Sequence, residues 1–120
     1  MAEPENVVSV NPYFKVKPGK MDAFKAALPA FIEKVATEPG NLYYEFTING
    51  DVVYCREAYA GAKGFLAHLE LVGAMLPGLL ELSDVIRLEV HGPAAELEQL
   101  KGPLADMKPE YFVSYTKVKR

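Results

Sequence analysis

The chain has 120 residues, of which half are apolar, and its 13 basic and 16 acidic side chains give a net charge of −3. This length and composition predict one small domain that buries a core without disulfides or metals. So mild a charge gives no electrostatic basis for binding nucleic acid or an acidic membrane surface. The longest apolar stretch, Leu66–Leu82, is interrupted by polar residues and is not a membrane span.

The sequence also predicts a cytoplasmic location. Cys55 is the only cysteine, so the chain forms no internal disulfide, which favours a reducing compartment. Met1 to Val8 contains acidic residues and no apolar run, unlike a secretory signal.

The first half of the chain reads as strand, helix and hairpin. Val7–Val16 is rich in β-branched and aromatic residues and predicts a strand, in which Pro12 suggests an edge position or a bulge. A helix is expected from Asp22 to about Ala36, because apolar residues recur there at helical spacing. Two strands, Leu42–Ile48 and Val52–Tyr59, flank the hairpin signal Asn49-Gly50-Asp51.

The second half adds two helical segments and two strands. A helix begins at Gly61 and resumes after Pro77-Gly78 as far as Leu82, and strand Asp84–Val90 follows. A short helix, Ala94–Leu104, and a strand, Glu110–Val118, complete the chain. The order predicts an α+β, ferredoxin-like β-α-β-β-α-β fold with an antiparallel sheet, extended by a C-terminal helix and strand. We expect a single domain over 1–120, with a core at about 7–91 and an extension at 92–120.

Strand alternation predicts two different faces on this sheet. The face toward the helices should carry the apolar residues Val8, Val10, Phe14, Val16, Leu42, Tyr44, Phe46 and Ile48. The other face mixes tyrosines with polar residues, namely Ser9, Asn11, Tyr13, Lys15, Tyr43, Glu45 and Thr47. Such a face is either covered by a partner subunit or left in solvent.

Three short segments resemble the antibiotic biosynthesis monooxygenase (ABM) domain family over residues 7 to 91. Val16 to Phe24 (VKPGKMDAF) is similar to the family's first strand–helix junction. Glu38 to Glu45 (EPGNLYYE) resembles its Glu-Pro-Gly-x-x-x-Tyr-Glu segment, and Arg56 to Tyr59 (REAY) resembles the end of its third strand. His68, nine residues after Tyr59, falls where the family often has a helix histidine.

The resemblance implies a homodimeric α+β barrel, packed sheet to sheet, with a pocket between sheet and helices in each subunit. It implies cofactor-independent oxygenation of small, quinol- or anthrone-like aromatics. The chain lacks tryptophan, which argues against the haem-degrading members of the family. No nucleotide or flavin motif is present, so no cofactor is expected.

His68 is the first candidate for chemistry, because it lies on the apolar side of its helix, where an imidazole can take a proton near neutral pH. The alternative is a core histidine bonded to a backbone carbonyl. Asn11 is the second catalytic candidate, since an amide stabilises a developing oxyanion. An aromatic ligand would contact the substrate-binding candidates Tyr13, Tyr44, Tyr59, Phe65 and Val72, although tyrosines in strands also serve simply to pack.

The remaining polar residues carry weaker signals. Arg56 and Glu57 should point to opposite faces, and each is expected in a cross-strand ion pair. His68 and His91 lack the close spacing of a metal motif, so no metal site is predicted. The leading function is therefore a cofactor-independent monooxygenase acting on a small electron-rich aromatic. A non-catalytic protein that binds a small ligand and a purely structural dimer module are the alternatives.

Overall fold

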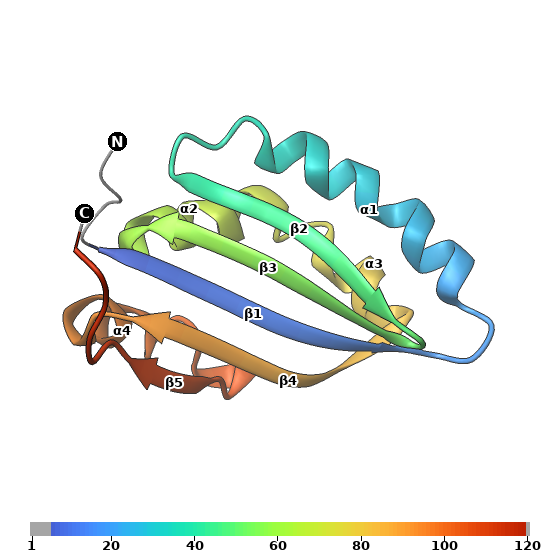
Figure 1. Cartoon of the computed structure of the whole chain (residues 1–120). Helices are drawn as coiled ribbons and strands as arrows, with labels where there is room; N and C mark the ends of the chain where they lie inside the picture. Colours follow the sequence, from blue (N-terminus) through green and yellow to red (C-terminus); the bar gives the residue numbers. More distant parts are fainter. Residues whose placement is uncertain (1–5, 120) are drawn as a thin grey trace.

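A computed structural model describes residues 6–119 and confirms the predicted α+β, ferredoxin-like fold (Figure 1). The elements in chain order are β1 (Val7–Val16), α1 (Met21–Val35), β2 (Asn41–Asn49), β3 (Val52–Ala60), α2 (Gly61–Val72), α3 (Leu76–Glu81), β4 (Ser83–Gly92), α4 (Ala94–Leu100), a 3₁₀ turn (Ala105–Met107) and β5 (Glu110–Val113). None of the helices in residues 6–119 is long and apolar enough to cross a membrane.

The five strands form one sheet in the order β2-β3-β1-β4-β5, with the helices on one side (Figure 1). The pairs within β1 to β4 are antiparallel, as predicted, whereas β5 pairs parallel to β4. A parallel neighbour requires a crossover connection, and α4 provides it. The predicted edge strand at the C-terminus therefore joins its own subunit's sheet.

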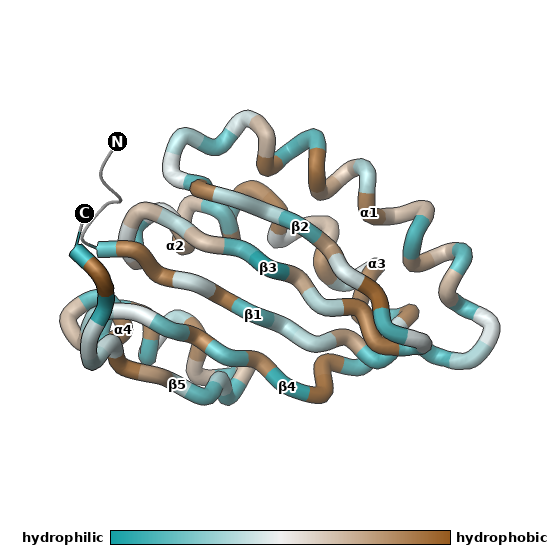
Figure 2. Tube along the Cα trace, viewed as in Figure 1, coloured by the Kyte–Doolittle hydropathy of each residue, from teal (hydrophilic) through white to brown (hydrophobic). Residues whose placement is uncertain are grey.

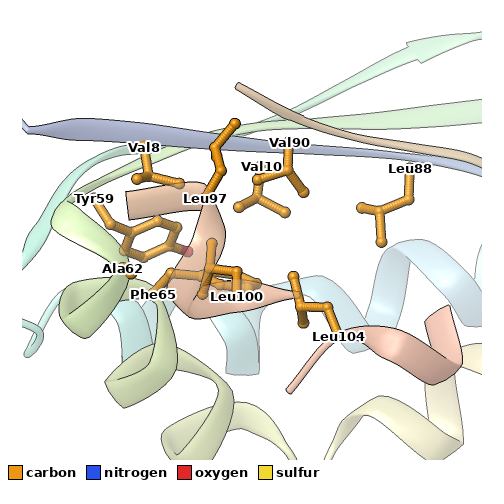
Figure 3. Packing of buried hydrophobic residues seen from close by; sticks show 10 residues of the cluster. All are labelled: Val8, Val10, Tyr59, Ala62, Phe65, Leu88, Val90, Leu97, Leu100 and Leu104. Atoms are coloured by element: carbon orange, nitrogen blue, oxygen red, sulfur yellow. The ribbon is translucent and has the colours of Figure 1, made fainter. Parts of the chain in front are cut away.

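Two buried clusters fill the space between the sheet and the helices. One joins β1, β3 and β4 to α2 and to the segment of Leu97, Leu100 and Leu104, whose side chains point toward the strands (Figure 3). The other surrounds Phe24 and Phe31 of α1. Hydrophilic and hydrophobic residues alternate along β1, as expected for a strand with one covered face (Figure 2).

Several boundaries differ from the sequence-based expectations. The helix predicted over Ala94–Leu104 ends at Leu100, because Gly102 and Pro103 disfavour its continuation, although Leu104 is still buried. Strand β5 ends at Val113 instead of Val118, and Tyr115 beyond it is 97% exposed. Pro12 was expected at a sheet edge or at a bulge. It lies in a central strand, beside a register shift between Tyr13 and Phe14, so the expected bulge is correct and the edge position is not.

The apolar face of β2 is less covered than predicted. Tyr44 and Phe46 are partly buried against the second cluster. Leu42 and Ile48, which were expected to meet the helices, are 41% and 47% exposed. They lie near the two ends of an edge strand, and a register shift between Asn41 and Tyr43 interrupts the pairing beside Leu42.

Candidate active site

A cavity of about 90 Å³ lies between the sheet and helices α1, α2 and α3. Its wall is formed mainly by apolar side chains from the strands and helices on both sides. Four polar residues interrupt this lining: Tyr44, Cys55, Glu57 and His68. A small apolar cavity with a few converging polar groups is the usual form of a ligand or active site.

His68 is held in this cavity by the loop that follows α1. A Cβ at Gly64 of α2 would lie only 3.2 Å from the Gly40 carbonyl oxygen, so the glycine permits the close approach of loop and helix. The Gly40 carbonyl also accepts a hydrogen bond from the Ala60 amide at 2.8 Å, which fixes the loop to β3. Glu38, two residues earlier in that loop, thereby reaches His68 with 2.8 Å between Oε2 and Nδ1.

Glu57 approaches the other nitrogen of His68 from β3. Alternation along the strand directs Val53, Cys55 and Glu57 toward the helices, and all three are buried. Glu57 Oε1 accepts a hydrogen bond from the Tyr59 hydroxyl at 2.6 Å and lies 3.5 Å from His68 Nε2. The result is a buried row of four ionisable groups, in which Glu38 is hydrogen-bonded to His68 and Tyr59 to Glu57.

Burial sets the protonation of this chain. It raises the pKa of Glu57 to about 7; the neighbouring Glu38 adds to the rise, and hydrogen bonds from Tyr59 and Cys55 oppose it. Burial lowers the pKa of His68 below its usual value, against the opposing effect of Glu38. Near pH 7 the imidazole is therefore neutral and able to accept a proton, while a large fraction of Glu57 is protonated and able to donate one.

Aromatic rings surround the imidazole and restrict its orientation. The rings of Tyr59, Tyr44 and Phe65 lie with centroids 5.0, 5.5 and 5.9 Å from that of His68. Burial, followed by the negative charges nearby, raises the pKa values of the Tyr44 and Tyr59 hydroxyls, so both remain protonated. The Tyr59 hydroxyl donates to Glu57, and the protonated Tyr44 hydroxyl has a proton that it can donate.

The structure brings together some of the predicted site residues and separates others. His68, Tyr44, Phe65 and Val72 all line the cavity, and Tyr59 packs directly against His68. Asn11 and Tyr13, by contrast, lie on the face of the sheet that no helix covers. Asn11 Oδ1 accepts a hydrogen bond from the Ser9 hydroxyl at 3.3 Å, and the Tyr13 ring contacts Tyr54 with 4.6 Å between centroids.

The sequence-based analysis missed two residues of the site. The expected ion pair of Arg56 does form, with Glu45 at 3.0 Å. The expected ion pair of Glu57 was wrong, because its side chain is buried among Cys55, Tyr59 and His68. A signal was available, since Glu57 is the one acidic residue on a strand face otherwise made of Val53, Cys55 and Tyr59. No periodicity marks Glu38, which lies in a loop.

The two histidines do not come together. His91 lies on the face away from the helices, with Nε2 2.9 Å from Glu89 Oε1 and its ring stacked on Phe112. Within residues 6–119 no group of three His, Cys, Asp or Glu side chains has a geometry that holds a metal ion.

Comparison with known proteins places this arrangement in a family. The family model described as antibiotic biosynthesis monooxygenase matches residues 7–71. The chain is 42% identical to MupZ from Pseudomonas fluorescens, with a TM-score of 0.91, over 95% of this chain and 94% of MupZ.

More distant solved structures share the fold alone. A conserved protein from Methanosarcina mazei Go1 is 20% identical over 72% of this chain and 91% of its own, with a TM-score of 0.67. A protein from Shewanella oneidensis is 23% identical over 75% of this chain and 92% of its own, with a TM-score of 0.61. No curated protein matches the chain. On the family match and the likeness to MupZ, the chain belongs to the antibiotic biosynthesis monooxygenase family.

Proposed function

We propose that this protein is a cofactor-independent monooxygenase acting on a small, uncharged, electron-rich aromatic such as a quinol or an anthrone. The observation that carries the proposal is the pairing of a neutral His68 with a partly protonated Glu57 at an otherwise apolar cavity. Membership of the monooxygenase family supports the same reaction class.

In this mechanism His68 Nε2 takes a proton from an acidic C–H or O–H group of the substrate, and the substrate itself supplies the electrons. The resulting carbanion reduces dioxygen and forms a C–O bond. The peroxide oxygen is protonated by Glu57. In a substrate with a CH₂ group, such as an anthrone, the second C–H proton and hydroxide then leave together as water, and a carbonyl stands where the CH₂ group was. Transfer of the first proton from His68 back to Glu57 restores both residues. One oxygen atom enters the product and the other leaves as water. General acid–base help of this kind typically contributes a factor of about 10² to 10⁴ in rate.

The cavity also restricts which substrates fit. No lysine or arginine lines it in the described part of the chain, and Glu57 adds an acidic group, so a carboxylate or phosphate on the substrate would be disfavoured. Its volume of about 90 Å³ is smaller than the roughly 150 Å³ of an engineered cavity that holds benzene. Binding of a multi-ring substrate therefore requires outward movement of lining side chains, among which Leu80, Val85 and Met107 are exposed to solvent.

A second candidate is a redox-neutral acid–base reaction in the same cavity. The specific observation in its favour is Glu57, whose pKa near 7 supplies an acid beside the base without any need for oxygen. A non-catalytic protein that binds a small apolar ligand is the remaining alternative.

One experiment separates these functions. The wild-type protein is mixed with a panel of quinols and anthrones, in air and, separately, under anaerobic conditions in D₂O. Oxygen uptake that matches product formation one to one, with no added cofactor, supports the monooxygenase. Incorporation of deuterium into the substrate without any oxygen uptake would contradict the monooxygenase proposal and support the redox-neutral reaction. A raised melting temperature with neither reaction indicates binding alone.

We also propose that the chain forms a homodimer in the cytoplasm, through the sheet face that no helix covers. This face carries three aromatic contacts available to a second copy, Tyr13 on Tyr54, Arg56 over Tyr43, and His91 on Phe112. Light scattering at micromolar concentration should give about twice the chain mass of 13.2 kDa. A monomer at that concentration would exclude the dimer without affecting the active-site proposal.

A further inference from the structure

We propose that Glu38 is a positioning residue for this site, which holds His68 in the tautomer with its proton on Nδ1, so that the unprotonated Nε2 serves as the base. The inference rests on the acid–base function proposed above and assigns the residue that prepares its base.

The two ring nitrogens of His68 have different surroundings. Nδ1 lies 2.8 Å from Glu38 Oε2, which is within hydrogen-bond distance, and the two side chains are only 5% and 7% exposed. An ionised carboxylate can only accept, so Nδ1 must donate. A neutral imidazole carries one proton, and Nε2 is then left with a free lone pair.

Nε2 makes no strong hydrogen bond to another residue in the described part of the chain. It lies 3.5 Å from Glu57 Oε1, beyond the usual hydrogen-bond range. That oxygen already accepts the Tyr59 hydroxyl at 2.6 Å. The lone pair of Nε2 is therefore available to a substrate in the cavity that His68 lines.

The other oxygen of Glu38 also favours this assignment. Oε1 is buried and has no hydrogen-bond partner among residues 6–119. Burial of a carboxylate costs free energy, which hydrogen bonds to its oxygens offset. The bond from His68 is the one that offsets this cost for Glu38 in the described part of the chain. The same charge stabilises the imidazolium that forms when Nε2 takes a proton.

The groups around His68 come from separate elements, so the two nitrogens are controlled independently. Glu38 reaches Nδ1 from the loop after α1, whereas Glu57 and Tyr59 on β3 and Tyr44 on β2 are the other titratable groups against the ring. Glu38 thus acts through His68 and is absent from the cavity lining.

The test measures the tautomer directly and needs no substrate. The chain has two histidines, so a long-range ¹H–¹⁵N NMR spectrum contains two imidazoles, and a His91→Gln variant assigns them. We expect wild-type His68 to carry its proton on Nδ1. Glu38→Leu, which removes the acceptor, should shift His68 toward the Nε2-protonated form, whereas the exposed control Glu45→Leu should leave it unchanged.

A wild-type His68 protonated on Nε2, or an unchanged tautomer in Glu38→Leu, would overturn the assignment. If Glu38→Leu does not fold, Glu38→Gln provides the second readout. It removes the negative charge while retaining an acceptor, so the pH midpoint of His68 should fall, and an unchanged midpoint would contradict the proposal. Because these signals do not depend on turnover, they remain interpretable if the oxygenase proposal fails.

Discussion

The two faces of the sheet each carry a histidine beside a glutamate, and they differ mainly in burial. On the helix-covered face, His68 lies 2.8 Å from Glu38 with 5% of its side chain exposed. On the open face, His91 lies 2.9 Å from Glu89 with 43% exposed. The ring of His91 is therefore partly open to water, while apolar and aromatic side chains surround His68.

This difference shows how burial under the helices changes the protonation of ordinary residues. In water, a histidine–glutamate pair is screened and contributes little. Under the helices, burial lowers the pKa of His68 and raises that of Glu57, so that a base and an acid are present at the same pH. The chemistry therefore depends on where helix α2 and the loop after α1 place these groups.

The largest expected effect compares the two histidines in the oxygenase reaction. His68→Gln should reduce turnover about a hundredfold or more, because the base is lost. His91→Gln should leave turnover near the wild-type value, because its ring lies on the other face of the sheet. The rate of oxygen uptake is measured for both variants. An equal loss of rate in both would contradict the assignment of the base to the helix-covered face.

Glu57→Gln should change how stability depends on pH. The folded protein holds the Glu57 proton up to about pH 7, whereas the unfolded chain releases it near 4.5. Stability from this group is therefore present below pH 4.5 and lost as the pH rises through 7, in total about 3 kcal/mol. Relative to wild type, the variant should gain stability between pH 5 and pH 8 in urea unfolding. A constant difference across that range would show that Glu57 titrates normally.

Two truncations compare the packed and exposed parts of the C-terminal segment. Termination after Met107 removes β5, including Tyr111, which packs on the first cluster, and should cost about 1–3 kcal/mol. Termination after Ser114 removes the exposed Tyr115 and Val118 and should change stability by less than about 0.5 kcal/mol. Thermal unfolding measures both. A large loss of stability on termination after Ser114 would mean that the exposed segment after Ser114 contacts a partner subunit.

The smallest expected effect is on the open face. Arg56→Ala breaks the ion pair between Arg56 and Glu45. Both side chains of this pair are more than half exposed. It should cost less than about 1 kcal/mol, and added salt should reduce the cost further. A loss that is larger and independent of salt would show that this face is shielded from water.

The sequence was sufficient to predict the fold but only part of the site. Periodicity and turn residues indicated every strand and the main helices, because these features are local. His68 stood out on an apolar helix face. Glu38 and Glu57 did not stand out. Each owes its role to a contact with His68, which is 30 residues from Glu38 and 11 from Glu57 along the chain. Asn11 and Tyr13 lie outside the cavity, on the face opposite the helices, where strand alternation had already placed them.

The most direct test of the account is the titration of Glu57 itself. In a ¹³C-labelled protein, carboxyl NMR signals followed from pH 4 to 9 report the midpoint of each acidic side chain. We expect one carboxyl that titrates near pH 7 in the wild type and is missing in Glu57→Gln. If no carboxyl titrates above pH 6, Glu57 is ionised at neutral pH, and the covered face does not hold the acid that the proposed chemistry requires.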